Sequence, residues 1–299
     1  MSTEIERVPI LLDTDIGNDI DDAVTLAYLL NQPRCQLLGI TTVSGEAGKR
    51  KALTEWILEA AGRTDIPVFS GQDAALMGDT MINHCPQAAA LPAGRSITPS
   101  DPGEAVRFMS RTIRANPGKV TLLAVGPLTN VALLFLTDPE APKLLDRLVL
   151  MNGRFHNSLP WLPLREWNVE NDPLATAIAW RAPVRQILSV GIDTTVRVSL
   201  PRAENEKRFI GPVWEPVKKM AEIWYKVTDQ ITYHDPLAAV SIFEPDLCKW
   251  EVGKVDVELG SERVSGITHW YPNAEPKTHT VSADVDAPRF FEHFFSVFR

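Results

Sequence analysis

Five aspartates stand within ten residues near the start of the chain, in the segment VPILLDTDIGNDIDDAVTLAYLL of residues 8–30. They are Asp13, Asp15, Asp19, Asp21 and Asp22. Apolar runs flank them on both sides, which predicts buried neighbours. Two unit charges about 4 Å apart repel by roughly 4 kcal/mol at an effective dielectric near 20. Carboxylates held together in a cleft therefore need a cation, protons or water, whereas a solvated acidic loop is the simpler alternative.

Polar residues also follow other short apolar runs of the chain. The segments are SGE (44–46), VGPLTN (125–130) and MNG (151–153). In open α/β sheets, ligands bind beyond the carboxyl ends of the strands. If each apolar run is a strand of one sheet, these loops and the acidic segment share one edge of that sheet.

Two later segments contain further side chains that could bind a metal ion or a ligand at the same edge of the sheet. LREWNVENDP contains Glu166 and Asn168, and YHDPLAAV contains His234 and Asp235. An all-oxygen set of ligands suits a hard cation such as Ca²⁺ or Mg²⁺ rather than zinc. Each residue also has a structural explanation, since an aspartate before proline is a common helix N-cap and a lone histidine is commonly structural. Tryptophans and tyrosines near these segments are expected in the core or at its rim: Trp161, Trp167, Trp224 and Tyr225.

The elements that position these residues alternate between short apolar runs and helical patterns. Predicted strands cover 8–12, 35–43, 66–71, 119–126, 146–153 and 184–190. Predicted helices cover 22–30, 48–62, 103–118, 127–137 and 286–298, with Gly62 as a C-cap and Pro127 in a first turn. This order predicts an α/β fold with an open, mostly parallel sheet and helices on both faces. From about residue 246 onward, two further segments predict a small C-terminal antiparallel hairpin.

Composition restricts the class of protein. The chain has 299 residues, 44% of them hydrophobic and 23% charged, and a net charge of −8. We expect a single α/β domain over residues 1–299, and no nucleic-acid partner, because such binding relies on basic patches. No signal peptide and no apolar run of about 18 residues is found, so no membrane partner is expected. Cysteines 35, 85 and 248 form no metal-binding pattern and predict reduced thiols in a cytoplasmic protein.

Two segments lack a regular pattern. Residues 74–101 are rich in Ala, Pro, Gly and Asp, and residues 154–165 carry two prolines. Long irregular loops in compact domains are frequently lids or binding loops. Both segments are therefore candidates for the rim of a ligand site.

Five segments together resemble the inosine–uridine-preferring nucleoside hydrolase family. LLDTDIGNDIDDA is similar to the family's N-terminal fingerprint, DTDPGxDDA, and ITTVSGE to its second-strand segment. AVGPLTNVAL resembles its central strand–turn–helix, EWN its ribose-binding segment, and HDPLAAV the segment with its late metal ligand. The order and approximate spacing hold from residue 8 to the end of the chain.

The resemblance implies hydrolysis of the N-glycosidic bond of a nucleoside, with a bound Ca²⁺ ion. By residue, it implies that Asp15, Asp22, Asp235 and the carbonyl of Val125 hold the metal, and that Asp15 is the general base. His234 is expected near the leaving base. The residues expected to contact the substrate are Asp21, Glu46, Asn152, Glu166, Asn168, Trp224 and Tyr225. The resemblance also implies a homodimer or homotetramer.

The chain departs from the family pattern on the sugar and base side. Ile16 replaces the usual proline, and two extra residues precede the Asp21–Asp22 pair, which makes Asp19 a rival for either role. Glu46 stands where the family usually has asparagine. Pro160 lies near the position of another customary asparagine. The preferred base and the identity of the sugar therefore stay open.

Two other functions remain alternatives at this stage. A haloacid-dehalogenase-type phosphatase also ends its first strand in DxD, with Asp13 as nucleophile, Asp15 as acid/base and Mg²⁺ as cofactor. Gly17 and the early pair of aspartates fit that class poorly. The altered loops and Glu46 motivate the second alternative, a non-catalytic relative that binds a nucleoside or a sugar.

Overall fold

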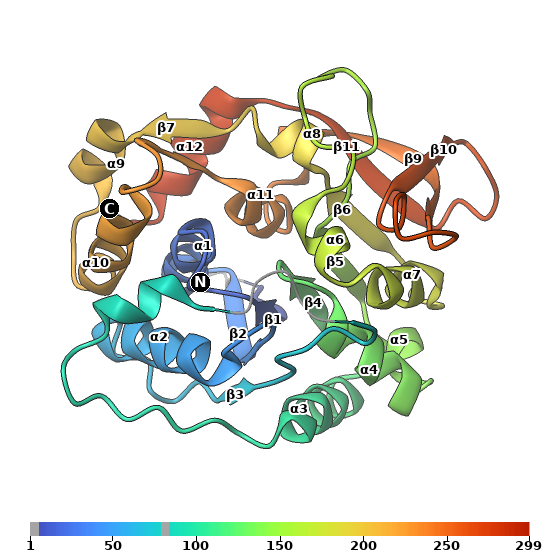
Figure 1. Ribbon diagram of the computed structural model, residues 1–299. Coiled ribbons are helices and arrows are strands. Elements are labelled where there is room, and N and C mark those ends of the chain that lie inside the picture. Colours follow the sequence, from blue (N-terminus) through green and yellow to red (C-terminus); the bar gives the residue numbers. More distant parts are fainter. Residues whose placement is uncertain (1–5, 79–83, 299) are drawn as a thin grey trace, which may run out of the picture.

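A nine-stranded mixed sheet forms the centre of the molecule (Figure 1). The computed structural model describes residues 6–78 and 84–298. The strand order is β10-β9-β11-β6-β5-β4-β1-β2-β3. The six strands from β6 to β3 are parallel. They are β1 (Val8–Thr14), β2 (Cys35–Thr42), β3 (Val68–Ser70), β4 (Thr121–Ala124), β5 (Arg147–Met151) and β6 (Ile187–Val190).

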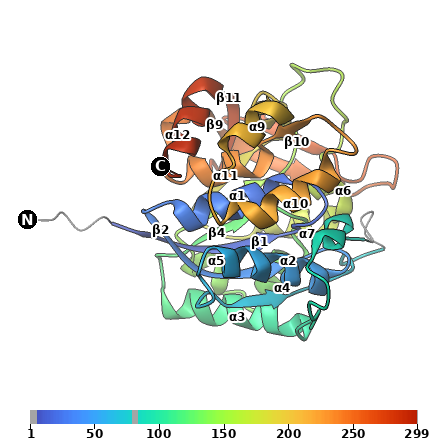
Figure 2. The same cartoon turned by 90° about the vertical axis from the view of Figure 1, so that its left-hand side faces the viewer.

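Helices cover both faces of this sheet, as the alternation of strands and helices predicts. One face packs against α1 (Asp21–Asn31), α2 (Ala47–Ala60), α10 (Trp214–Trp224), α11 (His234–Ser241) and α12 (Ala287–Ser296). The other face packs against α3 (Pro102–Ala115), α4 (Thr129–Thr137) and α7 (Pro173–Arg181). Figure 2 shows β1 between α1 and α11 above and α3 and α4 below.

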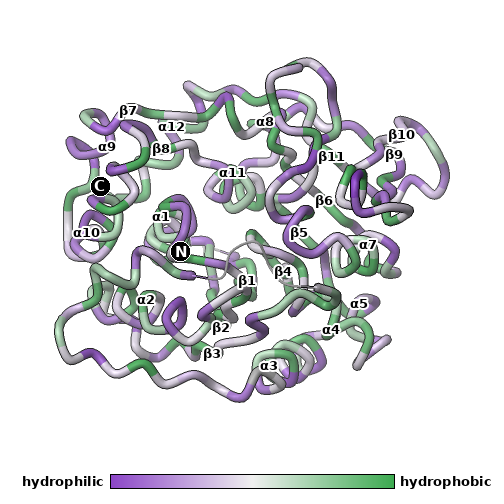
Figure 3. The backbone as a smooth tube through the Cα atoms, viewed as in Figure 1, coloured by the Kyte–Doolittle hydropathy of each residue, from purple (hydrophilic) through white to green (hydrophobic). Residues whose placement is uncertain are grey.

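The sequence of β1 shows why both faces are covered. Successive side chains of a strand point to opposite faces. Ile10 and Leu12 belong to the core under α1, and Leu11 belongs to the core under α4. All three are at most 1% exposed, so β1 is buried on both faces, like the strands of other parallel sheets. In Figure 3, hydrophobic segments run through the centre of the molecule.

Helix boundaries differ from the predicted ones at two prolines. Helix α4 begins at Thr129, and Pro127 lies before it rather than in its first turn. Helix α3 ends at Ala115, three residues before the predicted end. Pro117 lies just beyond it, and proline disfavours helical backbone in the residue before it.

The predicted C-terminal hairpin is present, but it continues the main sheet. Strands β9 (Cys248–Val257) and β10 (Thr268–Pro272) are antiparallel. The unpredicted strand β11 (His279–Val285) pairs antiparallel with β9 and parallel with β6. A separate two-stranded antiparallel sheet, formed by β7 (Ser199–Pro201) and β8 (Gln230–Thr232), was also not predicted. Its strands are three residues long, too short to show an alternating pattern.

Short elements complete the described chain. They are η1 (Pro86–Ala90), α5 (Ala141–Leu144), α6 (Trp167–Asn171), α8 (Ile192–Thr195), α9 (Arg202–Arg208) and η2 (Pro245–Leu247). Part of the predicted irregular segment 74–101, residues 79–83, lies outside the described residues. None of the helices in the described ranges combines the length and apolar character needed to span a membrane.

The strand order reverses beside β1. From β1 the chain proceeds outward through β2 and β3, and it then returns to place β4 on the other side of β1. Ligands of open α/β sheets bind in the crevice outside the carboxyl ends of the strands at such a reversal. The fold therefore directs attention to the residues that follow β1 and β4.

Candidate functional site

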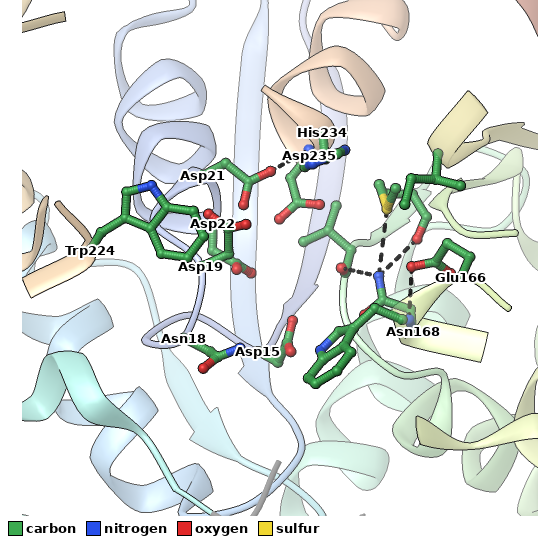
Figure 4. A pocket seen from close by; sticks show the side chains of 14 residues that line it. Asp15, Asn18, Asp19, Asp21, Asp22, Glu166, Asn168, Trp224, His234 and Asp235 are labelled. Carbon is green, nitrogen blue, oxygen red and sulfur yellow. Dashed lines mark hydrogen bonds between the residues drawn. The ribbon is translucent and has the colours of Figure 1, made fainter. Parts of the chain in front are cut away.

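A pocket of about 270 Å³ opens at this reversal. It contains side chains from the loop after β1, the loop after β4, and helices α6, α10 and α11. Many of the residues predicted from the sequence line it: Asp15, Asp21, Asp22, Val125, Glu166, Asn168, Trp224, His234 and Asp235. Figure 4 shows the aspartates on one side of the pocket, with Glu166 and Asn168 facing them.

Three carboxylates meet at the base of α1 and α11. Asp21, Asp22 and Asp235 each offer one oxygen, and these oxygens lie within 4.8 Å of one another. All three residues are at most 4% exposed. The backbone N–H of Asp235 donates to Asp21 Oδ2 at a distance of 2.9 Å, and Thr14 Oγ1 donates to the carboxylate of Asp22. The first and last acidic motifs of the sequence are therefore joined directly.

The three carboxylates repel one another and the neighbouring aspartates when they are ionised. Burial, followed by repulsion from neighbouring aspartates, raises the pKa of Asp21, Asp22 and Asp235 well above its ordinary value. No lysine or arginine among the described residues forms an ion pair with these three carboxylates. A buried group of oxygen ligands with excess negative charge fits a hard divalent cation such as Ca²⁺.

Asp15 lies beside a fully buried arginine. The guanidinium of Arg50 donates to the carbonyls of Ser44, Gly45, Asp15 and Ile16, so it ties the loop after β1 to the loop after β2. Burial raises the pKa of Asp15 to about 6, and the charge of Arg50 opposes that rise.

Glu166 and Asn168 are fixed by backbone contacts on the opposite side. Glu166 caps α6 by accepting from the N–H groups of Asn168 and Val169, and it also accepts from Gly153 N at 3.0 Å. Asn168 Nδ2 donates to the carbonyls of Val125 at 2.7 Å and Met151 at 3.0 Å. With its amide nitrogen occupied, Asn168 keeps its Oδ1 to accept a hydroxyl. Burial raises the pKa of Glu166 to about 7.

His234 and Trp224 line the remaining wall of the pocket. Burial lowers the pKa of His234 to about 4, so its ring is neutral at pH 7. Thr195 Oγ1 lies 2.6 Å from His234 Nδ1. Trp224 Nε1 donates to the Gln230 carbonyl at 2.9 Å, which fixes the indole. The pocket thus has a flat apolar ring and a neutral imidazole among its lining residues.

The lengthened loop brings two further polar residues to the pocket. Asn18 and Asp19 both line it. Gln87 is fully buried. Its backbone N–H donates to the Gly17 carbonyl at 3.0 Å, and its Nε2 donates to the Asn18 carbonyl at 3.0 Å. Burial raises the pKa of Asp19 to about 6. The two extra residues are therefore an ordered part of the site.

Three residues expected to contact the substrate lie elsewhere. Glu46 is paired with Lys49 and accepts from Cys85 N at 2.7 Å, so it anchors the segment before η1 rather than lining the pocket. Asn152 is fully buried, and its Oδ1 accepts from Trp180 Nε1 at 3.0 Å. The ring of Tyr225 lies 4.8 Å below the Arg202 guanidinium carbon.

Sequence reasoning did not select four pocket residues, Asn18, Met151, Trp167 and Ile192. Met151 is the last residue of β5, and Ile192 begins α8 directly after β6. The rule that selected the loops after the other strands would also have selected the loop after β6. Asn18 lies within the two-residue insertion, for which the family pattern has no counterpart.

Comparison with known proteins identifies the family of the chain. The family model described as inosine-uridine preferring nucleoside hydrolase matches residues 10–292. The chain belongs to this family, whose enzymes are nucleoside N-ribohydrolases. The resemblance seen in the five sequence segments is thereby confirmed, and the phosphatase alternative is excluded.

Curated relatives cover nearly the whole chain. The chain is 30% identical to the probable uridine nucleosidase 2 of Arabidopsis thaliana, over 95% of each protein. It is also 30% identical to the pyrimidine-specific ribonucleoside hydrolase RihA of Escherichia coli, over 95% of this chain and 96% of the relative.

Solved structures share the fold. A plant nucleoside hydrolase, PpNRh1, superposes with a TM-score of 0.82 at 24% identity, over 97% of this chain and 98% of the other. A purine-preferring ribonucleoside hydrolase from Gardnerella vaginalis superposes with a TM-score of 0.84 at 23% identity, over 97% of each chain. The predicted open α/β fold is confirmed.

Proposed function

We propose that this protein hydrolyses the N-glycosidic bond of ribonucleosides with the help of Ca²⁺, releasing the free base and ribose. The observation that carries the proposal is the buried group of Asp21, Asp22 and Asp235, whose carboxylate oxygens lie within 4.8 Å of one another in the pocket that also contains Glu166 and Asn168. A cation site beside hydroxyl-binding groups suits a sugar as the ligand.

The donors present fit calcium. Asp22 and Asp235 would hold the ion, and Asp21, whose oxygen belongs to the same group, would be a further ligand. Asp15 and the Val125 carbonyl, which line the same pocket, would complete the set. When bound, Ca²⁺ would supply positive charge that lowers the pKa of a nearby water and orients sugar hydroxyls. The Val125 carbonyl already accepts from Asn168, but an oxygen with two lone pairs can accept twice.

Asp15 would accept the proton from the attacking water. Its carboxylate lines the pocket beside the acidic group, so it is placed to take a proton from a water bound there. Oxygens of Glu166 and Asn168 would bind ribose hydroxyls and stabilise the positive charge that develops on the sugar as the glycosidic bond breaks. His234 would lie near the leaving base, and Trp224 would pack against the face of that base.

Uridine is the first substrate to test. Relatives at 30% identity are named for uridine or for pyrimidine ribonucleosides. A flat ring can pack against the apolar side chains of the pocket, which are Met151, Trp167, Ile192 and Trp224. Such contacts do not select a hydrogen-bonding pattern of the base. Purines therefore belong in the same panel.

A ribose-release assay tests the proposal. Uridine, cytidine, inosine and adenosine are incubated with the protein, either with Ca²⁺ or with a chelator. Ribose and free base should appear in equal amounts and only with Ca²⁺. Tight binding of a nucleoside without ribose release would instead support the non-catalytic alternative. Light scattering on the same sample checks the predicted homodimer or homotetramer.

A further inference from the structure

Helix α8 connects the end of β6 to the pocket through one side chain. Ile192, its first residue, lines the pocket, and Thr195, its last, is fully buried. Thr195 Oγ1 lies 2.6 Å from Nδ1 of His234, which begins α11. Two residues separated by 39 positions in the sequence thus share a short hydrogen bond at the wall of the pocket.

The distances around Thr195 indicate where its proton lies. The hydroxyl has two acceptors in reach, His234 Nδ1 at 2.6 Å and the Ile192 carbonyl at 3.4 Å. The shorter contact is well within the range of a strong O–H hydrogen bond, and the longer one is at its limit. The shorter contact favours donation from the hydroxyl to Nδ1; the alternative, in which Nδ1–H donates to Oγ1 and the hydroxyl donates to the Ile192 carbonyl, is decided by the spectrum described below. In a neutral imidazole whose Nδ1 accepts, the ring proton is on Nε2.

Thr195 is itself held rigidly. Its N–H donates to the Gly191 carbonyl at 3.0 Å, and the hydroxyl of neighbouring Thr194 donates to the Ser282 carbonyl in β11 at 3.1 Å. Asp193 accepts from the N–H groups of Phe155 and His156. Helix α8 is therefore tied both to the sheet and to the loop at 154–165, and it offers the histidine a fixed partner.

We propose that Thr195 is a positioning residue: its hydroxyl holds His234 so that the Nε2–H group, and not a ring carbon, faces the leaving base. This inference rests on the proposed function. The histidine χ2 torsion has two broad, roughly equivalent orientations. Without a partner on Nδ1 the ring can turn over, or move its proton to Nδ1, and the hydrogen bond to the base is lost. Figure 4 shows His234 beside Asp235 at the pocket wall.

Kinetics of three variants test this role. Thr195→Val keeps the shape and removes the hydroxyl, and Thr195→Ser keeps the hydroxyl. The control is Thr176→Val, which removes an equally buried hydroxyl that donates to the Asp172 carbonyl at the start of its own helix, away from α8. With uridine, Thr195→Val should lower kcat by roughly tenfold to hundredfold. This is less than the roughly 10²–10⁴-fold contribution of a complete acid–base group, because the histidine itself remains. KM should change little. Thr195→Ser should restore most of the rate, and Thr176→Val should match the native protein.

The leaving group provides the second comparison. A p-nitrophenyl riboside releases a stable phenolate that needs no hydrogen bond, so all three variants should cleave it at nearly the native rate. Equal losses on both substrates in Thr195→Val, or no loss on uridine, would overturn the proposal.

A spectroscopic measurement separates this inference from the proposed function. In protein labelled with ¹⁵N-histidine, the His234 signals are assigned from their disappearance in His234→Gln. The native spectrum should show the proton on Nε2, and Thr195→Val should shift it toward a mixture of the two forms. A native spectrum with the proton on Nδ1 would refute the role of Thr195. If no nucleoside releases ribose, the proposed function is wrong, and this spectrum still decides the link between Thr195 and His234.

Discussion

The single residues Asp22 and Asp235 show that the acidic group destabilises the metal-free folded state by electrostatic repulsion. Each is buried, and repulsion from other aspartates raises its pKa beyond the effect of burial. In the absence of a cation, removing one of these charges removes repulsion. In the presence of Ca²⁺, the same change removes a ligand. The two effects have opposite signs, so they can be measured separately.

Asp22→Asn should therefore raise the melting temperature in a chelator but abolish the increase that millimolar Ca²⁺ gives to the native protein. Calorimetry measures both shifts. Asp65→Asn, which changes an exposed aspartate paired with Arg63, is the control and should keep the Ca²⁺ response. A native protein with no Ca²⁺-dependent shift would contradict the metal assignment.

Asp15→Asn tests the base. The amide keeps the shape and one oxygen donor, but it cannot accept the proton from water. Turnover of the best nucleoside should fall by about 10²–10⁴-fold, the usual contribution of general base catalysis. Near-normal turnover would point instead to Asp19, which lines the same pocket with a pKa raised to about 6.

The residue types of the site could be predicted from the sequence, whereas several of its contacts could not. Asp15, Asp22, Glu166, Asn168 and Asp235 lie in recognisable segments, and the structure brings them to one pocket. The partner of a side chain depends on packing between distant elements, which one sequence does not reveal. Glu46 shows the difference, because its carboxylate turns away to Lys49 and the backbone of Cys85.

At the scale of elements, the loop between β1 and α1 depends on a close approach. Gly17 has φ +117°, and a Cβ atom there would lie 2.3 Å from Cys85 Sγ and 2.9 Å from Leu53 Cδ1. Only glycine combines that backbone conformation with that space. The segment before η1 can then contact the loop and hold its two extra residues.

Gly17→Ala should lower the free energy of unfolding by about 2–4 kcal/mol, because strained backbone and overpacking add. Urea titration measures it. Gly62→Ala is a matched control, since Gly62 has φ +66° with no atom within 4 Å of a built Cβ. It should lose only about 1 kcal/mol, for backbone strain alone. Equal losses in the two variants would show that the contact with Cys85 does not matter.

The elements that the sequence predicted are those with long apolar patterns. Such patterns occur in strands β1, β2, β4 and β5, whose side chains enter the cores on both faces of the sheet. They also occur in the helices between these strands, each of which packs on one face. Strand β11 was missed because only part of HTVSADV is buried and its polar residues conceal the alternation. Its parallel pairing with β6 is a long-range contact that local pattern does not encode.

At the scale of the whole molecule, the buried acids determine how stability depends on pH. Burial raises the pKa of Asp13 and Glu166 to about 7 and that of Asp15 to about 6, all above the value near 4 of an unfolded chain. Between pH 4 and 7 the folded state therefore binds more protons than the unfolded state. The protons bound by these acids add to the free energy of unfolding. This contribution is complete below pH 4 and is lost as the pH rises through 6 and 7.

The metal-free protein should consequently melt at a lower temperature at pH 7.5 than at pH 5. The increase given by Ca²⁺ should grow over the same interval, because metal binding releases the protons that the acids hold. Thermal melts in matched buffers, with chelator or with saturating Ca²⁺, measure both trends. A metal-free melting temperature that rises from pH 5 to 7.5 would be inconsistent with these buried acids.

The bond between Asp21 and the backbone of Asp235 spans 214 positions of the chain. On a ribosome that adds roughly 5–20 residues per second, the second motif follows the first by roughly 10–40 s. Until the end of that interval the nascent chain carries its acidic loop without α11, the helix that encloses it. The loop is hydrated while it waits, which keeps the emerging N-terminal segment charged next to its apolar strands. Closure of the site is therefore among the last events of synthesis, and a truncated chain that stops before residue 235 would leave this charge exposed to solvent.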